Sequence, residues 1–504
     1  MKINAPELLE PNQLIRKIQK ISPFVPIKPH YRILLIILIS LQLLIEFMEF
    51  INSNSESTTW ASLAGLGQSV MLYLPIFFYR SSYGWFHPLI FLPLYTFAFN
   101  LPLFIPKVFQ LFWEGPGSLV FVPVTNAALS DWGKESMIRL NTYASLITII
   151  SIGAYYLGFF LLPSLKTPQL KLKQIKNAGI KTVLAVTFSV LVFLVFVDGH
   201  GGLTGHLVAN WLGGRHANFA GQYYWAFLIN FGIVACLIWL AIDPNVFTKP
   251  LFWSCAISAM LTRFLFSGSR SAIIYFMMIG VMTWMIRKGR FSLIKVVGII
   301  LVAIIGVGLL GTFRNVVRDT GVANFSTLTD IQGGLVQAIG SDEEAGELTG
   351  GRNGGPLPIL AYVPKREGYL YGSTYLAALT LPIPRSIWPE KPGLCGGRAA
   401  QTFYFEQADW AIPCGSIGEA YWNFGLPGVC VVFFLYGYFH KWLAQSFRKY
   451  AGYASTIVLY TIILFYVRPD TTSVMKLLQL VIQTMILLYL WGGLPLFWRR
   501  IRKI

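Results

Sequence analysis

Long apolar runs separated by short polar and basic stretches make up most of the chain. A helix needs about 20 predominantly apolar residues to cross the hydrocarbon core of a bilayer. Runs that approach or reach this length lie near residues 33–51, 61–79, 88–106, 142–163, 180–198, 223–242, 250–266, 272–286, 293–312, 416–439, 454–467 and 473–495. The pattern is weakest near 88, 272 and 454. It predicts an all-α polytopic integral membrane protein with about twelve transmembrane helices.

Two stretches depart from this pattern. Residues 6–22 space their leucines and isoleucines along one helical face with basic residues between them, which predicts a short amphipathic helix on the inner leaflet. Residues 313–415 are too polar and too rich in Pro and Gly to cross a bilayer, and they are much longer than an ordinary connection. We expect this long segment to contain short helices and to lie outside the membrane.

The composition agrees with a membrane protein. Hydrophobic residues make up 55% of the chain, charged residues only 12%, and the mean hydropathy is +0.58. A soluble core of 504 residues would not bury that much apolar surface. The first thirty residues contain no apolar run that ends at a small-residue cleavage site, so we expect insertion to begin at the first membrane helix.

The basic residues predict the orientation. If both termini face the cytoplasm, the inside segments hold 24 of the 40 Lys and Arg residues but only three of the 22 acidic residues. Such an excess is typical of cytoplasmic loops, where it suits anionic lipid headgroups. The same residues form no groove with interleaved aromatic side chains, which argues against nucleic acid as a partner.

The cysteines leave two readings open. Cys395 and Cys414 both lie in the long outside segment, where they would either form a disulfide or remain two thiols. Cys236, Cys255 and Cys430 lie in predicted spans, where a thiol acts as a small apolar side chain. No Cys and His cluster has the spacing of a zinc site, so we predict no metal and no cofactor.

Arginine predominates among the basic residues outside the inner segments, with eleven Arg against five Lys. A guanidinium group forms two parallel charge-assisted hydrogen bonds with a phosphate and keeps its proton, so this bias favours a site for a lipid-linked diphosphate. A ring of arginines that anchor helix ends is the alternative. The candidate phosphate ligands are Arg215, Arg270, Arg314, Arg318, Arg385 and Arg468, the last at the outer turn between the final two spans.

Arg263 and Arg270 lie seven residues apart and would share a helical face if the turn between them were helical. An arginine this close to hydrocarbon needs a partner, either an internal carboxylate or a bound anion. We assign the bound anion to Arg270.

Residues 357–428 carry the remaining candidate chemistry. In IPRSIWPEKP, Arg385 and Lys391 flank Trp388, whose ring suits stacking on a sugar, although such a Trp also serves as an interface anchor. Glu419 lies at the mouth of the tenth span in GSIGEAYWNFGLPG, beside Tyr421 and Asn423. A carboxylate that is partly desolvated there suits accepting a proton from a sugar hydroxyl; the alternative is a carboxylate paired with an arginine for folding.

These motifs carry a resemblance. The GSTY sequence at 372–375, PRSIWPEKPG, SIGEAYWNFGLPG, the FSGSRSAIIYF turn and the GGL at 201–203 resemble bacterial O-antigen and exopolysaccharide repeat-unit polymerases of the Wzy type. The resemblance covers roughly residues 198–440. It implies a metal-independent glycosyltransferase that moves a growing glycan from undecaprenyl diphosphate to the non-reducing end of an incoming undecaprenyl-diphosphate-linked oligosaccharide.

The resemblance also implies a place in the cell. The protein would be a multi-pass protein of the bacterial inner (plasma) membrane, with both termini cytoplasmic and its active site periplasmic. Its partners would be the lipid-linked oligosaccharides, membrane lipids and a chain-length regulator protein that the sequence does not identify. The expected parts are a cytoplasmic amphipathic N-terminus (1–32), helices 1–9 (33–312), a large periplasmic segment (313–415), helices 10–12 (416–495) and a basic cytoplasmic tail (496–504).

Specific roles follow from the motifs. The outer-loop arginines of the family correspond here to Arg215, Arg270 and Arg314, although Gly221 follows Arg215 sooner than the family pattern has it. The predicted catalytic residues are Glu419, Arg270 and Arg385. The predicted substrate-binding residues are Arg215, Arg314, Arg318, Trp388, Lys391, Tyr421, Asn423 and Arg468.

Three other functions remain open. A lipid-linked glycan (O-antigen) ligase has the same architecture and donor, but that class usually has a histidine where Glu419 stands. A lipid-linked oligosaccharide transporter would show internal repeats and charges near mid-membrane. An enzyme that uses a monophosphate lipid would need acidic residues in the first outside loop, where only Glu56 stands clear of the helix ends.

Overall fold

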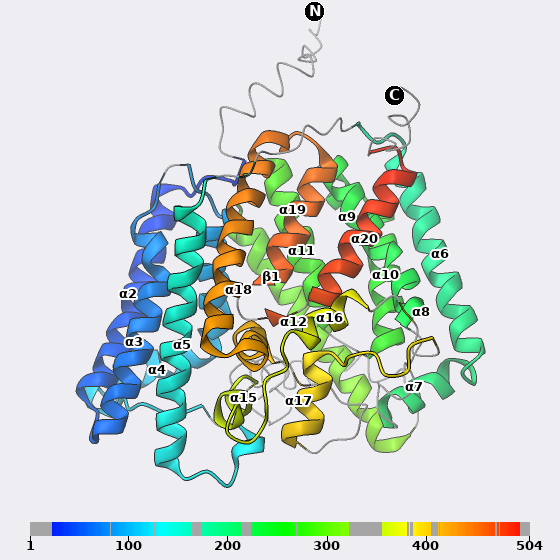
Figure 1. The fold of residues 1–504 in the computed structure, drawn as a ribbon. Coiled ribbons are helices and arrows are strands. Elements are labelled where there is room, and N and C mark those ends of the chain that lie inside the picture. Colours follow the sequence, from blue (N-terminus) through cyan, green and yellow to red (C-terminus); the bar gives the residue numbers. More distant parts are fainter. Residues whose placement is uncertain are drawn as a thin grey trace, which may run out of the picture.

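The computed structural model describes residues 23–80, 82–124, 126–163, 165, 173–212, 223–268, 271–321, 355–380, 383, 387–404, 412, 414–468, 471–472 and 474–493. These residues are helical apart from loops, turns and one pair of two-residue strands (Figure 1). The helix predicted within residues 6–22 lies outside them.

Between residues 23 and 321, the described residues form eleven α-helices and three short 3-10 turns. Their bounds are α2 Pro29–Ile51, α3 Glu56–Phe77, α4 Pro88–Trp113, α5 Lys134–Leu161, α6 Ala178–Asp198, α7 Gly202–Leu212, α8 Tyr223–Ile229, α9 Phe231–Ile242, α10 Pro250–Ser267, α11 Ser271–Lys288 and α12 Leu293–Thr320, with 3-10 turns η1 Pro116–Ser118, η2 Ala127–Leu129 and η3 Pro244–Thr248. Local signals explain several starts: proline opens α2, α4 and α10, and the Ser55 and Thr58 side chains form a capping box at α3.

The later part alternates short and long elements. They are α15 Leu357–Tyr362, α16 Ser373–Leu379, α17 Cys395–Tyr404, α18 Gly415–Tyr450, α19 Ala454–Tyr466, β1 Val467–Arg468, β2 Thr471–Thr472 and α20 Val474–Leu490. The short helices α15, α16 and α17 confirm that the long predicted outside segment contains short helices.

The predicted fold class is confirmed. Each of the twelve apolar runs coincides with helical structure, the run near 223–242 with α8 and α9 together. Within the described ranges, seven helices are long and apolar enough to cross a membrane, and three further apolar helices are shorter. The protein is therefore a predominantly helical polytopic membrane protein.

Helices α2 to α5 pack with α18 on one side of the molecule (Figure 1). Glycines let α5 and α18 approach closely: a Cβ at Gly158 would lie 1.9 Å from the Phe434 carbonyl oxygen, and one at Gly437 would lie 1.9 Å from the Tyr155 carbonyl oxygen. Small residues at such an interface bring backbones together where lipid provides no hydrophobic driving force. The α5 contact therefore positions α18.

Helix α9 forms the centre of the other side, and α6, α10, α11, α19 and α20 surround it. Every residue from Phe231 to Ala241 is buried. The helical run is interrupted at Asn230, and the Ser189 hydroxyl accepts a hydrogen bond from the Gly232 N–H at 2.8 Å. Buried backbone polar groups are thus satisfied by a neighbouring helix.

The basic residues of several predicted inside segments gather at one end of the molecule. Arg448 donates to the Ser82 carbonyl oxygen at 3.0 Å, and Lys288 donates to Asn245 Oδ1 at 2.6 Å. We call this the basic end. Figure 1 shows α7, α15 and α17 at the opposite end, which we call the site end.

One turn lies elsewhere than expected. Helix α19 has 13 residues, so it spans about 20 Å of a hydrocarbon core of about 30 Å. Strand β1 follows at once and pairs antiparallel with β2, Arg468 opposite Thr471. Figure 1 places these strands near mid-height, so Arg468 does not lie at an outer turn. The sequence shows the end of an apolar run but not the depth at which it falls.

Candidate functional site

Helix α18 is interrupted near its start. Gly425 has φ 65° and ψ −156°, outside the helical region, and Pro427 follows two residues later. In a regular helix the Trp422 and Asn423 carbonyls would accept from residues 426 and 427, but proline has no N–H to donate. The NFGLP run therefore ends the first helical segment and leaves carbonyl groups available.

The chain before α16 occupies these positions. The Leu370 N–H donates to the Trp422 carbonyl oxygen at 3.0 Å, and the Tyr371 N–H donates to that of Asn423 at 3.1 Å. The Gly372 N–H donates to Asn423 Oδ1 at 2.8 Å. Gly372 has φ 86°, and a Cβ there would lie 3.1 Å from Phe424 Cζ, which explains the glycine of the GSTY motif. The two motifs therefore form one structural unit.

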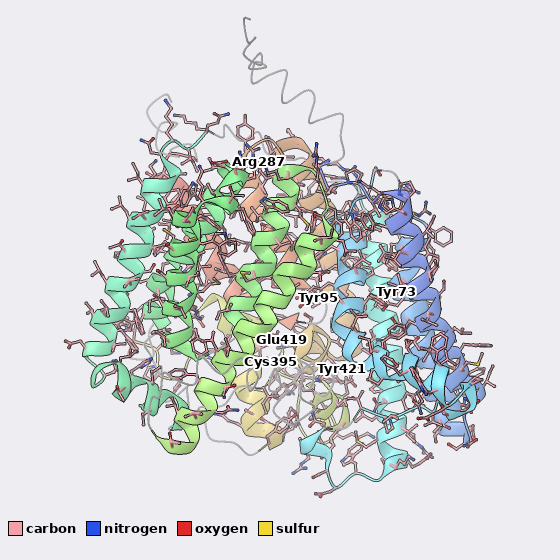
Figure 2. The ribbon with its side chains drawn as sticks, turned by 180° about the vertical axis from the view of Figure 1, so that it is seen from behind. Tyr73, Tyr95, Arg287, Cys395, Glu419 and Tyr421 are labelled. Atoms are coloured by element: carbon pink, nitrogen blue, oxygen red, sulfur yellow. A yellow bond between two sulfur atoms is a disulfide. The ribbon has the colours of Figure 1, made fainter. Side chains whose placement is uncertain are left out.

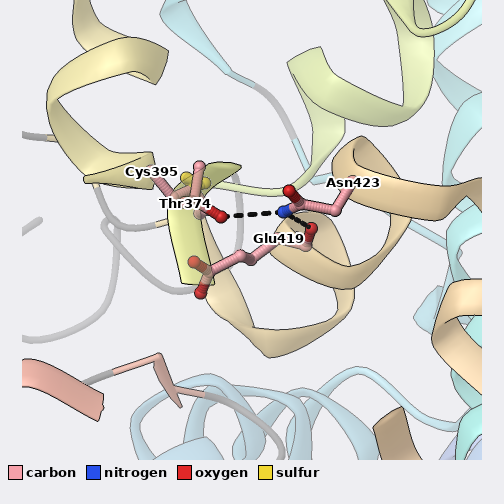
Figure 3. Close-up of a disulfide and its surroundings, with 5 residues drawn as sticks. Thr374, Cys395, Glu419 and Asn423 are labelled. Carbon is pink, nitrogen blue, oxygen red and sulfur yellow. Dashed lines mark hydrogen bonds between the residues drawn. A yellow bond between two sulfur atoms is a disulfide. The ribbon is translucent and has the colours of Figure 1, made fainter. Parts of the chain in front are cut away.

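Asn423 holds this unit together with its amide. Its Nδ2 donates to Thr374 Oγ1 at 2.8 Å and to the Glu419 carbonyl oxygen at 2.7 Å (Figure 3). Asn423 and Thr374 are 0% and 1% exposed. Each of these contacts is internal, so the predicted binding of substrate by Asn423 stays a prediction, while its role in the fold is plain.

Glu419 lies one helical turn before Asn423 and is 6% exposed. Figure 2 shows it between the centre of the molecule and the site end, close to Cys395 and far from Arg287. The carboxylate acts electrostatically on Tyr375 of α16 and on Tyr436 of α18. A buried carboxylate and two phenols on which its charge acts thus lie in the region where α18 meets α16.

Tyr375 is a residue to which the sequence analysis gave no role. Its ring stacks on Phe424, with centroids 6.4 Å apart and planes at 12°. Its hydroxyl is buried and has no hydrogen-bond partner among the described residues. Burial, and next the charge of Glu419, raise the pKa of the Tyr375 hydroxyl well above its usual range, so it keeps its proton. The GSTY motif at 372–375 is the sequence feature that could have pointed to Tyr375.

Aromatic side chains pack α15 and α17 onto α18. Phe403 of α17 lies 5.0 Å from the 2% exposed Trp422 and stacks on Tyr362 of α15 at 6.0 Å, measured between ring centroids. Trp132 Nε1 donates to the Tyr362 hydroxyl at 3.3 Å. These contacts hold α15 and α17 against the first segment of α18, which carries Glu419.

A disulfide closes the same region. Cys395, at the start of α17, is joined to Cys414, the N-cap of α18, across a sequence separation of 19 residues. Of the two readings that the sequence left open, the disulfide is the one observed.

Three further predicted residues are described, two of them with side-chain hydrogen bonds to protein partners. The Tyr421 hydroxyl lies 2.9 Å from the hydroxyl of Tyr143 on α5. Lys391 donates from Nζ to the Ile383 carbonyl oxygen at 2.8 Å, which braces its own loop. Trp388 in that loop is 37% exposed, so its ring is accessible. Binding of substrate by these residues stays a prediction.

The arginines are only partly described. Arg314 is half-buried on α12. Arg318 in α12 and Arg468 in β1 are placed by their backbones alone. Arg215, Arg270 and Arg385 lie outside the described residues.

Arg263 on α10 has the surroundings of an anion ligand, although the sequence analysis assigned the bound anion to Arg270. Its guanidinium carbon lies 5.7 Å from the centre of the Phe266 ring. Its Nη1 is buried without a hydrogen-bond partner, and none of the ion pairs found among the described residues includes it. An arginine in this setting favours a bound anion. Within the residues that the structure describes, no group of three His, Cys, Asp or Glu side chains is arranged to hold a metal ion.

A comparison with protein families now adds to the geometry. Residues 408–500 match the family model of the O-antigen polysaccharide polymerase Wzy. The match spans α18 with Glu419, Tyr421 and Asn423, and continues through the strand pair and α20. No curated protein and no solved structure matches the chain. The predicted resemblance to Wzy-type polymerases is confirmed for this part of the chain.

Proposed function

We propose that this Wzy-type membrane protein polymerises undecaprenyl-diphosphate-linked oligosaccharide repeat units at the periplasmic face of the bacterial inner membrane. The observation that carries this proposal is the buried carboxylate of Glu419, which lies inside the matched region and faces the α16 motif. The family match supports O-antigen polymerase activity in general. The undecaprenyl donor and the bacterial inner membrane are what the resemblance to this family implies. The arginine bias supports a diphosphate ligand, and the charge distribution supports the orientation.

The proposed reaction is a single glycosyl transfer. A hydroxyl oxygen at the non-reducing end of the incoming repeat unit attacks the anomeric carbon of the growing glycan. The bond from that carbon to the diphosphate oxygen breaks, and its electron pair leaves with the diphosphate. Glu419 accepts the proton of the attacking hydroxyl. The diphosphate is already a good leaving group, so no step of this reaction requires a metal.

Arginines would stabilise the charge that develops on the diphosphate. We assign this role to Arg270 and Arg385, with Arg215, Arg314, Arg318 and Arg468 as further ligands. Arg263 joins them because its buried guanidinium has an unpaired Nη1 within the described structure.

The interrupted helices support a site below the membrane surface. Irregular backbone is tolerated at membrane depth where it is buried in protein or lines a cavity. The break at Gly425 and the strand pair after α19 are two such interruptions, and β2 packs against α18. Transporters also use interrupted helices for their binding sites, so this feature keeps lipid-linked oligosaccharide transport as the second candidate.

One assay separates the candidates. Purified protein in lipid nanodiscs is incubated with undecaprenyl-diphosphate-linked repeat units isolated from cells that lack it. A ladder of longer glycans supports the polymerase, transfer only to a different added acceptor supports a ligase, and no new glycosidic bond supports a transporter. Arg270→Ala and Arg385→Ala should insert normally and give no ladder, and long glycan from either variant would exclude its assigned role.

A further inference from the structure

The hydroxyl of Tyr375 is the least explained polar group beside Glu419. It is buried and has no hydrogen-bond partner in the part of the chain that the structure describes. Burying a hydroxyl without a partner is unfavourable, and most buried polar groups avoid it. Such a group at a carboxylate-bearing site points to a partner that arrives with a ligand.

Other tyrosines around the site differ from Tyr375. The Tyr404 hydroxyl donates to Asn126 Oδ1 at 2.8 Å, and the Tyr421 hydroxyl pairs with that of Tyr143 at 2.9 Å. The hydroxyls of these two tyrosines therefore each have a protein partner. Tyr375 stands apart from them.

The Tyr375 ring is held firmly even though its hydroxyl is not paired. Asn423 fixes the start of α16 through Gly372 and Thr374, directly before Tyr375. Phe424 then stacks against the ring. A rigid side chain with one open hydrogen-bonding position loses little conformational freedom when a ligand binds.

The Tyr375 hydroxyl is in the protonation state of a hydrogen-bond donor. Because burial and the nearby Glu419 carboxylate oppose ionisation, the phenol stays protonated and can donate one hydrogen bond. A donor and a proton acceptor in one region can orient a sugar, since its oxygen atoms accept hydrogen bonds and its hydroxyl groups donate them.

We propose that the Tyr375 hydroxyl donates a hydrogen bond to an oxygen of the acceptor sugar and thereby presents the attacking hydroxyl to Glu419. This inference rests on the proposed polymerase function. Tyr375 moves no proton in it: the proton of the attacking hydroxyl still goes to Glu419, and the diphosphate still leaves with the bonding electron pair. Tyr375 is thus an acceptor-binding residue.

The test is Tyr375→Phe, which removes only the hydroxyl and keeps the ring that stacks on Phe424. In nanodiscs with isolated undecaprenyl-diphosphate-linked repeat units, we expect the KM for the acceptor to rise, and kcat/KM to fall, by roughly 10-fold to 100-fold. The Tm should stay the same or rise, because a buried unpaired hydroxyl has been removed.

Tyr404→Phe is the matched control. It removes a hydroxyl that hydrogen-bonds Asn126, so its Tm should fall while the acceptor KM stays that of the wild type. Wild-type kinetics in Tyr375→Phe would overturn the inference. A fall in Tm as large as that of Tyr404→Phe would also overturn it, because the hydroxyl would then have a structural partner.

Failure of the proposed polymerase function can be distinguished from failure of the proposed Tyr375 contact. If the wild type forms no ladder, Tyr375 is judged by the binding of the same isolated repeat units. Weaker binding to Tyr375→Phe would retain the sugar contact, whereas unchanged binding would overturn it.

Discussion

Asn423 Nδ2 donates a 2.8 Å hydrogen bond to Thr374 Oγ1, although 49 residues separate the two in sequence. Both side chains are almost fully buried. The bond joins α16, which carries Tyr375, to the first segment of α18, which carries Glu419. The proposed acceptor contact and the proposed base therefore keep a constant relation through one amide.

Breaking this amide should loosen the site. Asn423→Ala leaves the Gly372 N–H and the Thr374 hydroxyl without their partner, so we expect a loss of about 1–3 kcal/mol in stability. Thermal unfolding in detergent measures this loss of stability. A double-mutant cycle that combines Asn423→Ala with Thr374→Val should give a coupling energy of at least about 0.5 kcal/mol. Additive effects of the two changes would show that the bond does not couple them. Asn245→Ala, at the exposed Lys288 contact, is the control.

Glu419→Gln tests the proposed base. The amide keeps the shape but does not accept the proton, so chain growth should fall by about 10²-fold to 10⁴-fold while insertion and Tm persist. Polymer length on gels and initial rates measure it. Glu135→Gln, which alters an exposed pair with Arg139, should leave the rate unchanged. Undiminished turnover in Glu419→Gln would show that the carboxylate is structural.

Arg263→Met tests the buried guanidinium. Removing a buried charge that lacks a carboxylate partner among the described residues should leave the Tm equal or higher, whereas loss of an anion ligand should reduce polymer formation at least roughly tenfold. Arg139→Met on the exposed surface serves as the comparison. A large fall in Tm with full activity would identify a structural arginine instead.

The disulfide should contribute to stability. A cross-link between residues 19 apart lowers the entropy of the unfolded chain, so Cys395→Ser with Cys414→Ser should reduce stability by about 3 kcal/mol. Adding a reducing agent should lower the Tm of the wild type and leave the Tm of the double variant unchanged. A wild type indifferent to reduction would contradict this expectation.

Gly437→Ala tests the α5 and α18 contact. Because the added methyl group would meet the Tyr155 carbonyl oxygen of the backbone, the helices must separate, and we expect a loss of about 1–3 kcal/mol. Gly65→Ala on α3, where a Cβ would meet nothing within 4 Å, should be tolerated. Equal Tm values for the two variants would argue against the close approach.

Much of this protein can be read from local composition. Apolar runs become helices because a backbone in lipid must satisfy its own hydrogen bonds, so the helix positions follow from the runs. The resemblance to Wzy-type polymerases also rests on short motifs, and the match over residues 408–500 confirms it for the part of the chain that contains SIGEAYWNFGLPG.

The spatial relations of those motifs need the folded chain. No residue type distinguishes the hydroxyl of Tyr421, which Tyr143 binds, from that of Tyr375, which is left unpaired among the described residues. Nor does an apolar run show that α19 ends near mid-height. Hydrogen bonds between residues 49 apart depend on which distant segments meet, and that depends on packing of the whole helical assembly. The helices are therefore a property of the local sequence, whereas the site is a property of their contacts.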